Sequence, residues 1–98
     1  MSDPISIRNI TIAGSGTMGH GIGQDFALAG FPVSLYDISE EQLQKALQKI
    51  ERNYHEMAGW GLIAEEEIQP ALGRLRAFTS LADAVQDADL VVEAVPEY

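Results

Sequence analysis

The sequence predicts an α/β protein: a Rossmann-type doubly wound parallel sheet, truncated after its fourth strand. Two observations support this prediction. Short apolar segments rich in β-branched residues alternate with helical patterns along the 98 residues, and a glycine-rich turn follows the first of these segments. Such alternation is typical of β-α-β units with parallel strands. The length fits one small domain with a single core.

The first expected strand covers 9–13, where Ile10 and Ile12 are β-branched and stand just before glycines. The first expected helix follows over 17–29, and Gly30 is a suitable residue to end it. A strand, a helix and a strand in this order form the start of a parallel sheet.

A second strand is expected over 33–36, before the longest helix. Ser39 and Gln42 predict a capping box, in which the serine hydroxyl binds the Gln42 amide and the glutamine side chain reaches back. We expect the helix to run to about residue 58. One apolar face recurs along it at helical spacing: Leu43, Ala46, Leu47, Ile50, Tyr54 and Met57.

The remaining elements are expected to be shorter. An acidic helix begins near Ala64, with Pro70 limiting it or standing in a bend. A weak strand over 75–79 and a short helix from Ser80 to Val85 follow. The last strand, over 90–94, is apolar enough to be buried on both faces.

A G-x-G-x-x-G motif occupies 14–19, directly after the first strand and at the start of the first helix. Gly14 permits the tight turn, Gly16 lets a pyrophosphate approach the backbone, and Gly19 lets the helix lie close to the strand. Backbone amides and the helix dipole favour a phosphate there. Gly21 continues the run of small residues along the helix.

Asp37 stands at the end of the second strand. A carboxylate at this point accepts hydrogen bonds from the adenosine ribose and repels a 2′-phosphate. Because no basic residue follows at 38–40, the sequence predicts NAD rather than NADP as cofactor. The alternative is a glycine-rich turn beside an ordinary aspartate that flanks a helix.

His20 and Glu97 are ionisable residues near this expected site. His20 is either catalytic or, as we favour, a side chain facing solvent or the next element, because the sequence offers no partner for its imidazole. Glu97 follows the fourth strand, whose end lies beside the first strand where ligands bind in this topology. It is either a residue over the cofactor or a solvated carboxylate.

Composition narrows the function classes. The chain has 15 acidic and 6 basic side chains, a formal charge of −9, which argues against binding nucleic acid or an anionic membrane. It has no cysteine, so disulfides and cysteine-based metal sites are excluded, and no metal ligand is expected. Without an apparent signal peptide or membrane span, the expected location is cytoplasmic.

Segments 14–22, 33–37 and 89–97 together resemble the NAD-binding domain of the L-3-hydroxyacyl-CoA dehydrogenase family. The likeness covers essentially the whole chain, and the Met18 loop combined with the Glu-Ala-Val-Pro-Glu segment is its most specific part. By position, the resemblance implies three sets of cofactor-binding residues: Gly16, Thr17, Met18, Gly19, His20 and Gly21 for the pyrophosphate, Asp37 for the ribose, and Val95, Pro96 and Glu97 for the nicotinamide half.

The resemblance also implies an activity. The family transfers hydride reversibly between the 3-hydroxyl carbon of its substrate and NAD, in fatty acid metabolism, with a catalytic His–Glu pair. Neither His20 nor His55 corresponds to that histidine, so no catalytic residue is expected in this chain. Residues 1–98 would be the N-terminal part of the Rossmann domain. The remaining strands and a helical, dimer-forming C-terminal domain would lie outside it.

Some residues depart from the family pattern. Trp60 stands where many members have a lysine that meets CoA, and Asn53 where they have a serine. Lys45, Lys49 and Arg52 form a basic stripe on the long helix. We interpret it as a solvated face with two ordinary i,i+4 pairs, Glu41 with Lys45 and Arg52 with Glu56.

Three functions therefore remain open. The first is the cofactor-binding part of a 3-hydroxyacyl-CoA dehydrogenase. The second is a relative that reduces a small β-keto or diketo compound without CoA, and the third is a non-catalytic nucleotide-binding module.

Overall fold

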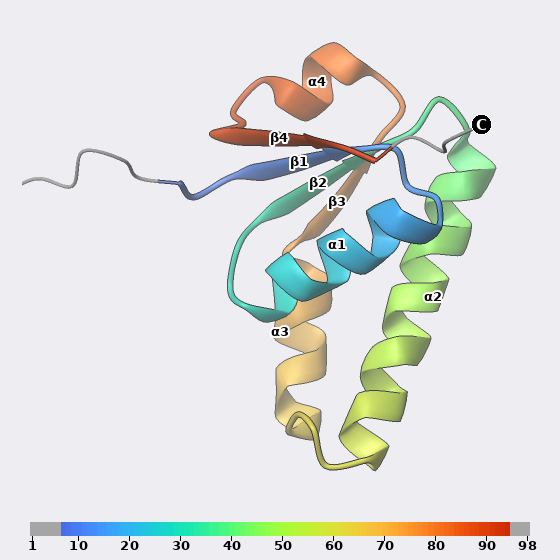
Figure 1. Cartoon of the computed structure of the whole chain (residues 1–98), viewed down its shortest axis with the longest axis vertical. Coiled ribbons are helices and arrows are strands. Elements are labelled where there is room, and N and C mark those ends of the chain that lie inside the picture. The colour runs from blue at the N-terminus through green and yellow to red at the C-terminus, as the bar shows by residue number, and fades with distance from the viewer. Residues whose placement is uncertain (1–6, 95–98) are drawn as a thin grey trace, which may run out of the picture.

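The computed structural model describes residues 7–94, which form a three-layer α/β arrangement (Figure 1). Its parallel sheet has the order β3-β2-β1-β4. The strands are β1 (Ile10–Ala13), β2 (Val33–Tyr36), β3 (Leu75–Phe78) and β4 (Leu90–Glu93). The helices are α1 (Thr17–Leu28), α2 (Glu40–Gly59), the 3₁₀ turn η1 (Glu65–Glu67), α3 (Ile68–Gly73) and α4 (Leu81–Val85). The expected neighbouring of the first and fourth strands is confirmed.

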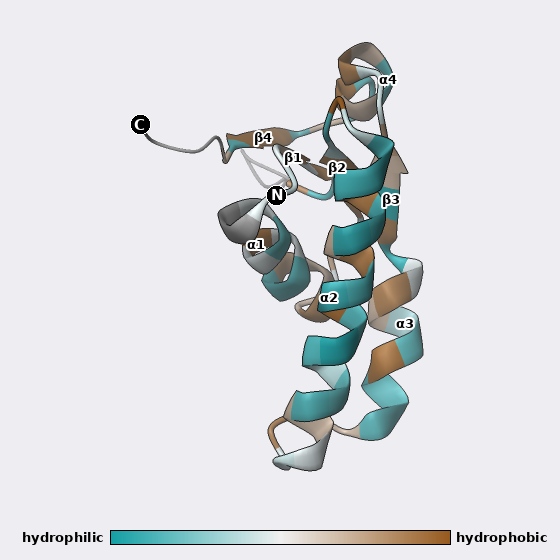
Figure 2. Cartoon of the chain, turned by 90° about the vertical axis from the view of Figure 1, so that its right-hand side faces the viewer, coloured by the Kyte–Doolittle hydropathy of each residue, from teal (hydrophilic) through white to brown (hydrophobic). Residues whose placement is uncertain are grey.

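The core lies between the sheet and the layer of α1, α2 and α3, while α4 lies on the opposite face of the sheet (Figure 1). Apolar side chains of β1 and β2 meet the buried face of α2, and Figure 2 shows the hydrophilic outer face of that helix. Its large, fully buried side chains include Ile10, Ile12, Val33, Leu35, Leu43, Ile50 and Tyr54. The periodicity of α2 therefore predicted its inner face correctly.

Long-range hydrogen bonds fix α1 against its neighbours. The Tyr54 hydroxyl donates to the Gln24 carbonyl at 2.6 Å, and the Arg74 guanidinium donates to the Ala27 carbonyl at 2.7 Å. Burial, with a smaller contribution from the charge of Asp25, raises the pKa of Tyr54 to about 12. These bonds place α1 firmly, and its N-terminus with it.

A second set of contacts ties β4 and α4 to β1. The Asp89 carboxylate accepts hydrogen bonds from the amides of Arg8 and Asn9, both at 2.9 Å. These amides, Asn9 first, hold the pKa of the Asp89 carboxyl below its ordinary value. On the α4 face of the sheet, the buried Thr11 hydroxyl donates to the Ala84 carbonyl at 2.6 Å.

Two expectations about the later elements were wrong. Strand β4 is not buried on both faces: Val91 is 45% exposed, because α4 packs over β1, β2 and β3 and leaves this face of β4 uncovered. Pro70 does not limit a helix but lies in the first turn of α3, where its missing N–H breaks no intrahelical bond. Within 7–94, no helix is both long and apolar enough to cross a membrane.

Candidate functional site

The glycine loop leaves β1 and runs along the carboxyl ends of two neighbouring strands. Gly14 has φ of +108°, a conformation that residues with a side chain rarely adopt. Its amide donates to the Tyr36 carbonyl at 2.8 Å, and a Cβ on it would overlap the backbone of Ala94. The turn therefore requires glycine here, as the sequence indicated.

Gly19 brings the first turn of α1 back onto this loop. A Cβ at Gly19 would overlap the carbonyl oxygen of Gly14, so the helix can start at this place only with glycine. At Gly16 and Gly21, by contrast, a Cβ would have no neighbour within 4 Å among residues 7–94. The open space at Gly16 fits a ligand that approaches the backbone.

The N-terminus of α1 is suited to an anion. Gly16 is its N-cap and provides no side-chain cap, and the first turn carries no acidic residue. The first amides of a helix lack intrahelical acceptors and carry partial positive charge. Thr17 and Met18 begin this turn, so their amides are among those available to a phosphate.

His20 was expected to face solvent or the next element, and the sequence offered no partner for it. In the structure it is shielded from solvent and has a partner. It is only 8% exposed, and its Nδ1 lies 2.9 Å from the Gly16 carbonyl oxygen. The partner is the N-cap of its own helix, four residues earlier. No sequence pattern signals this contact, because histidine has no fixed preference for a backbone carbonyl.

Asp37 joins the loop to α2. Its Oδ2 accepts from the Ser15 hydroxyl at 3.1 Å and from the Ser15 amide at 3.3 Å, while its Oδ1 accepts from the Ser39 amide at 2.9 Å. Sequence reasoning missed Ser15, which is 2% exposed. A small hydroxyl residue inside a buried glycine turn was the available signal, because buried hydroxyls are hydrogen-bonded.

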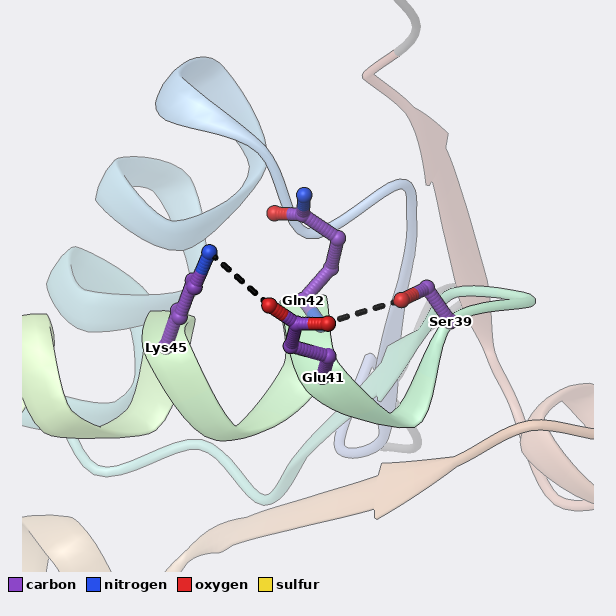
Figure 3. Close-up of polar contacts among 4 residues, drawn as sticks. All are labelled: Ser39, Glu41, Gln42 and Lys45. Carbon is purple, nitrogen blue, oxygen red and sulfur yellow. Dashed lines mark hydrogen bonds and ion pairs between the residues drawn. The ribbon is translucent and has the colours of Figure 1, made fainter.

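The capping box at the start of α2 is only half formed (Figure 3). The Ser39 hydroxyl accepts from the Gln42 amide at 3.2 Å, as expected. The Ser39 amide, which the Gln42 side chain was expected to bind, donates to Asp37 instead. The glutamine side chain is thereby left on the side of α2 that faces the glycine loop (Figure 3).

Comparison with known proteins decides the family. The family model described as "3-hydroxyacyl-CoA dehydrogenase, NAD binding domain" matches residues 9–98. The chain belongs to the 3-hydroxyacyl-CoA dehydrogenase family. A curated relative, a probable 3-hydroxybutyryl-CoA dehydrogenase of Bacillus subtilis, is 34% identical over 93 residues, which cover 95% of this chain and 32% of the relative.

Solved structures agree with this membership. The 3-hydroxybutyryl-CoA dehydrogenase of Escherichia coli superposes with a TM-score of 0.89 at 36% identity, over 96% of this chain and 20% of that one. A diketoreductase described as acting on dicarbonyl compounds superposes with a TM-score of 0.83 at 37% identity, over 95% of this chain and 33% of that one. The chain thus spans about a third or less of these proteins.

As the NAD-binding domain of this family, the chain has NAD as its cofactor, and its residues fit that group. The open backbone at Gly16, the uncapped α1 and the carboxylate of Asp37 lie together at the carboxyl ends of β1 and β2. Val95, Pro96 and Glu97, expected over the nicotinamide half, lie outside the described residues.

The structure also places the residues that depart from the family pattern. Asn53 donates from its Nδ2 to the Gln24 side chain at 2.7 Å and so bridges α2 to α1. Trp60 is the C-cap of α2 and is 72% exposed. Of the two expected ion pairs on α2, Glu41–Lys45 is present at 3.2 Å, whereas within 7–94 Arg52 forms none.

Proposed function

We propose that this chain is the cofactor-binding part of an enzyme that transfers hydride between NAD and the 3-hydroxyl carbon of an acyl-CoA substrate. One observation carries the proposal: Asp37, the acid that directly follows β2, is hydrogen-bonded to the glycine loop at the uncapped start of α1. Membership in the 3-hydroxyacyl-CoA dehydrogenase family supports hydride transfer to and from NAD as the reaction.

In this proposal, the backbone from Gly14 to Gly21 binds the pyrophosphate through the first amides of α1. Asp37 accepts hydrogen bonds from the adenosine ribose and disfavours a 2′-phosphate. Residues 95–97 cover the nicotinamide half. When bound, NAD supplies the carbon that accepts or donates the hydride.

The proposed acid–base residues lie outside this chain. His20 is a poor candidate, because its ring is largely buried and its Nδ1 contacts the Gly16 carbonyl. We therefore propose that 1–98 is the N-terminal part of the Rossmann domain. A further part of the protein would supply the remaining strands, the catalytic His–Glu pair and a helical dimerisation domain. Such an enzyme would act in the cytoplasm, in fatty acid metabolism.

Two measurements test this function. NADH titrated into the chain should give saturable nicotinamide fluorescence, with weaker binding of NADPH, and the chain alone should not oxidise a 3-hydroxyacyl-CoA. Turnover by residues 1–98 alone would contradict the proposal that the catalytic residues lie outside this chain. Absence of NADH binding would contradict the function altogether.

The substrate is tested with the complete enzyme. NADH oxidation should be faster with a 3-oxoacyl-CoA than with the matching free 3-oxo acid or a diketone. Faster oxidation with the free 3-oxo acid or the diketone would favour the alternative of a substrate without CoA. The similarity to a diketoreductase is the observation that favours this alternative. NADH binding without turnover of any of these substrates would favour the non-catalytic module.

A further inference from the structure

Half of the basic side chains of this acidic protein stand on one helix. The chain has 6 lysines and arginines against 15 acidic residues. Lys45, Lys49 and Arg52 follow one another on α2 at spacings of four and three residues, which places them on one side of the helix. The same helix also carries Glu40, Glu41, Glu51 and Glu56, so the helix as a whole is not positively charged and the three cations form a local stripe on it.

Two of these cations, Lys45 and Lys49, line a hollow that reaches the glycine loop. The hollow, of about 270 Å³, has Ser15, Gly16 and His20 on one side. The α2 side consists of Gln42, Lys45, Ala46 and Lys49. Figure 3 shows the side chains of Gln42 and Lys45 extending from α2 on this side. Among the described residues, none that lines the hollow carries a carboxylate.

The two lysines differ in their surroundings. Lys45 forms an ion pair with Glu41 at 3.2 Å, so part of its charge is already compensated. Lys49 forms no ion pair within residues 7–94. Opposite the lysines lies the buried ring of His20, whose Nδ1 is hydrogen-bonded to the Gly16 carbonyl. Its Nε2 has no hydrogen-bond partner among residues 7–94. The hollow therefore presents an uncompensated ammonium group and a ring nitrogen beside the uncapped α1.

We propose that Lys49 binds a phosphate group of the dinucleotide across this hollow, with His20 as the polar wall opposite. The inference rests on the proposed function, which places the pyrophosphate at the same loop. It differs from the interpretation of the basic stripe as a merely solvated face. The cofactor is favoured over a second ligand because Ser15 and Gly16, which belong to the dinucleotide loop, form one wall of the hollow.

The test compares Lys49→Gln with Lys49→Arg and with Arg52→Gln, each in the full chain. Arg52 is the matched control, because it carries the same charge on the same helix but does not line this hollow. We expect Lys49→Gln to raise the Kd for NADH about twofold to fivefold, as the loss of one exposed cation would. Lys49→Arg should restore most of the affinity, and Arg52→Gln should change it less than about twofold. The effect should shrink at high salt, where exposed charges are screened.

Other results would overturn the inference. If Lys49→Gln and Arg52→Gln bind NADH equally well, Lys49 contacts no phosphate of the dinucleotide. If Lys49→Gln weakens binding of coenzyme A alone but not of NADH, the phosphate belongs to the substrate instead. A wild-type chain that does not bind NADH removes the proposed function and this inference together, whereas normal binding with an inert Lys49→Gln removes only the inference.

Discussion

The carboxylate of Asp37 accepts hydrogen bonds from both the amide and the hydroxyl of Ser15, at 3.3 and 3.1 Å. Its other oxygen accepts from the Ser39 amide at 2.9 Å. One side chain therefore joins the glycine loop to the start of α2. In our proposal the same carboxylate binds the ribose, so it both shapes the loop and contacts the cofactor.

Replacement of Asp37 tests this double role. Asp37→Ala should weaken NADH binding by at least about tenfold, because charged hydrogen bonds are worth about 1.5–3 kcal/mol, and it should relax discrimination against NADPH. Ser15→Ala is the control: it removes only the hydroxyl donor and should change the Kd for NADH by less than about threefold. Titrations with both cofactors measure this. Unchanged affinity and selectivity in Asp37→Ala would exclude Asp37 from the site.

Two glycines of α1 offer a paired stability test. Gly19→Ala should lower the free energy of unfolding by about 1–3 kcal/mol, because its Cβ would overlap the Gly14 carbonyl and neither backbone segment can easily move. Gly21→Ala should raise it by about 0.5–1 kcal/mol, because that position is helical and open. Urea unfolding measures both. Equal stability of the two variants would contradict the close packing of α1 on the loop.

Tyr54 predicts a dependence on alkaline pH. Since burial raises its pKa from 10.0 to about 12, the neutral phenol stabilises the fold fully below pH 10. This stabilisation is lost as the pH rises from 10 to about 12. Tyr54→Phe should cost about 1 kcal/mol at pH 7, through loss of the bond to Gln24, and its difference from the wild type should shrink over that range. A difference that is constant from pH 8 to 12 would contradict the assignment.

Asp89 predicts the opposite dependence, at acidic pH. Because the amides of Asn9 and Arg8 lower its pKa, its ionised form stabilises the fold above the ordinary aspartate pKa of 3.8. That contribution disappears as the pH falls further. Asp89→Ala should therefore be less stable than the wild type at pH 7 and approach it only as the pH falls below 3.8, through the lowered pKa of Asp89. Asp87→Ala is the control, because within 7–94 Asp87 accepts no side-chain hydrogen bond. Equal behaviour of both variants in thermal unfolding would exclude the proposed contact.

The strands, the helices and the loop were largely predictable, because local patterns determine them. Alternating apolar segments, the glycine spacing and the Ser39 cap each act over a few residues, and the observed bounds differ little from the expected ones. The position of Asp37 beside the glycine loop was also predictable, because its place after β2 follows from the topology.

Contacts between distant residues were not predictable. A hydroxyl inside the glycine turn indicates that Ser15 is hydrogen-bonded, but not that Asp37 is its partner. The capping box formed only in part because Asp37 accepts a hydrogen bond from the Ser39 amide. The burial of His20 and its contact with Gly16 were not predicted, because its partner is a backbone carbonyl. The exposure of Val91 depends on what covers β4, which the pattern of the strand itself does not contain.

The central claim is that the glycine loop and Asp37 together bind NAD. The most direct test is an NMR titration in which NADH is added to the chain and the changes in the backbone amide shifts are recorded. We predict that the largest changes fall on residues 14–21 and on Asp37, with smaller changes on the side of α2 that faces the glycine loop, at Lys45 and Lys49. Changes centred instead on the α4 side of the sheet, around Arg76, Asp83 and Asp87, which line a separate hollow there, would contradict it.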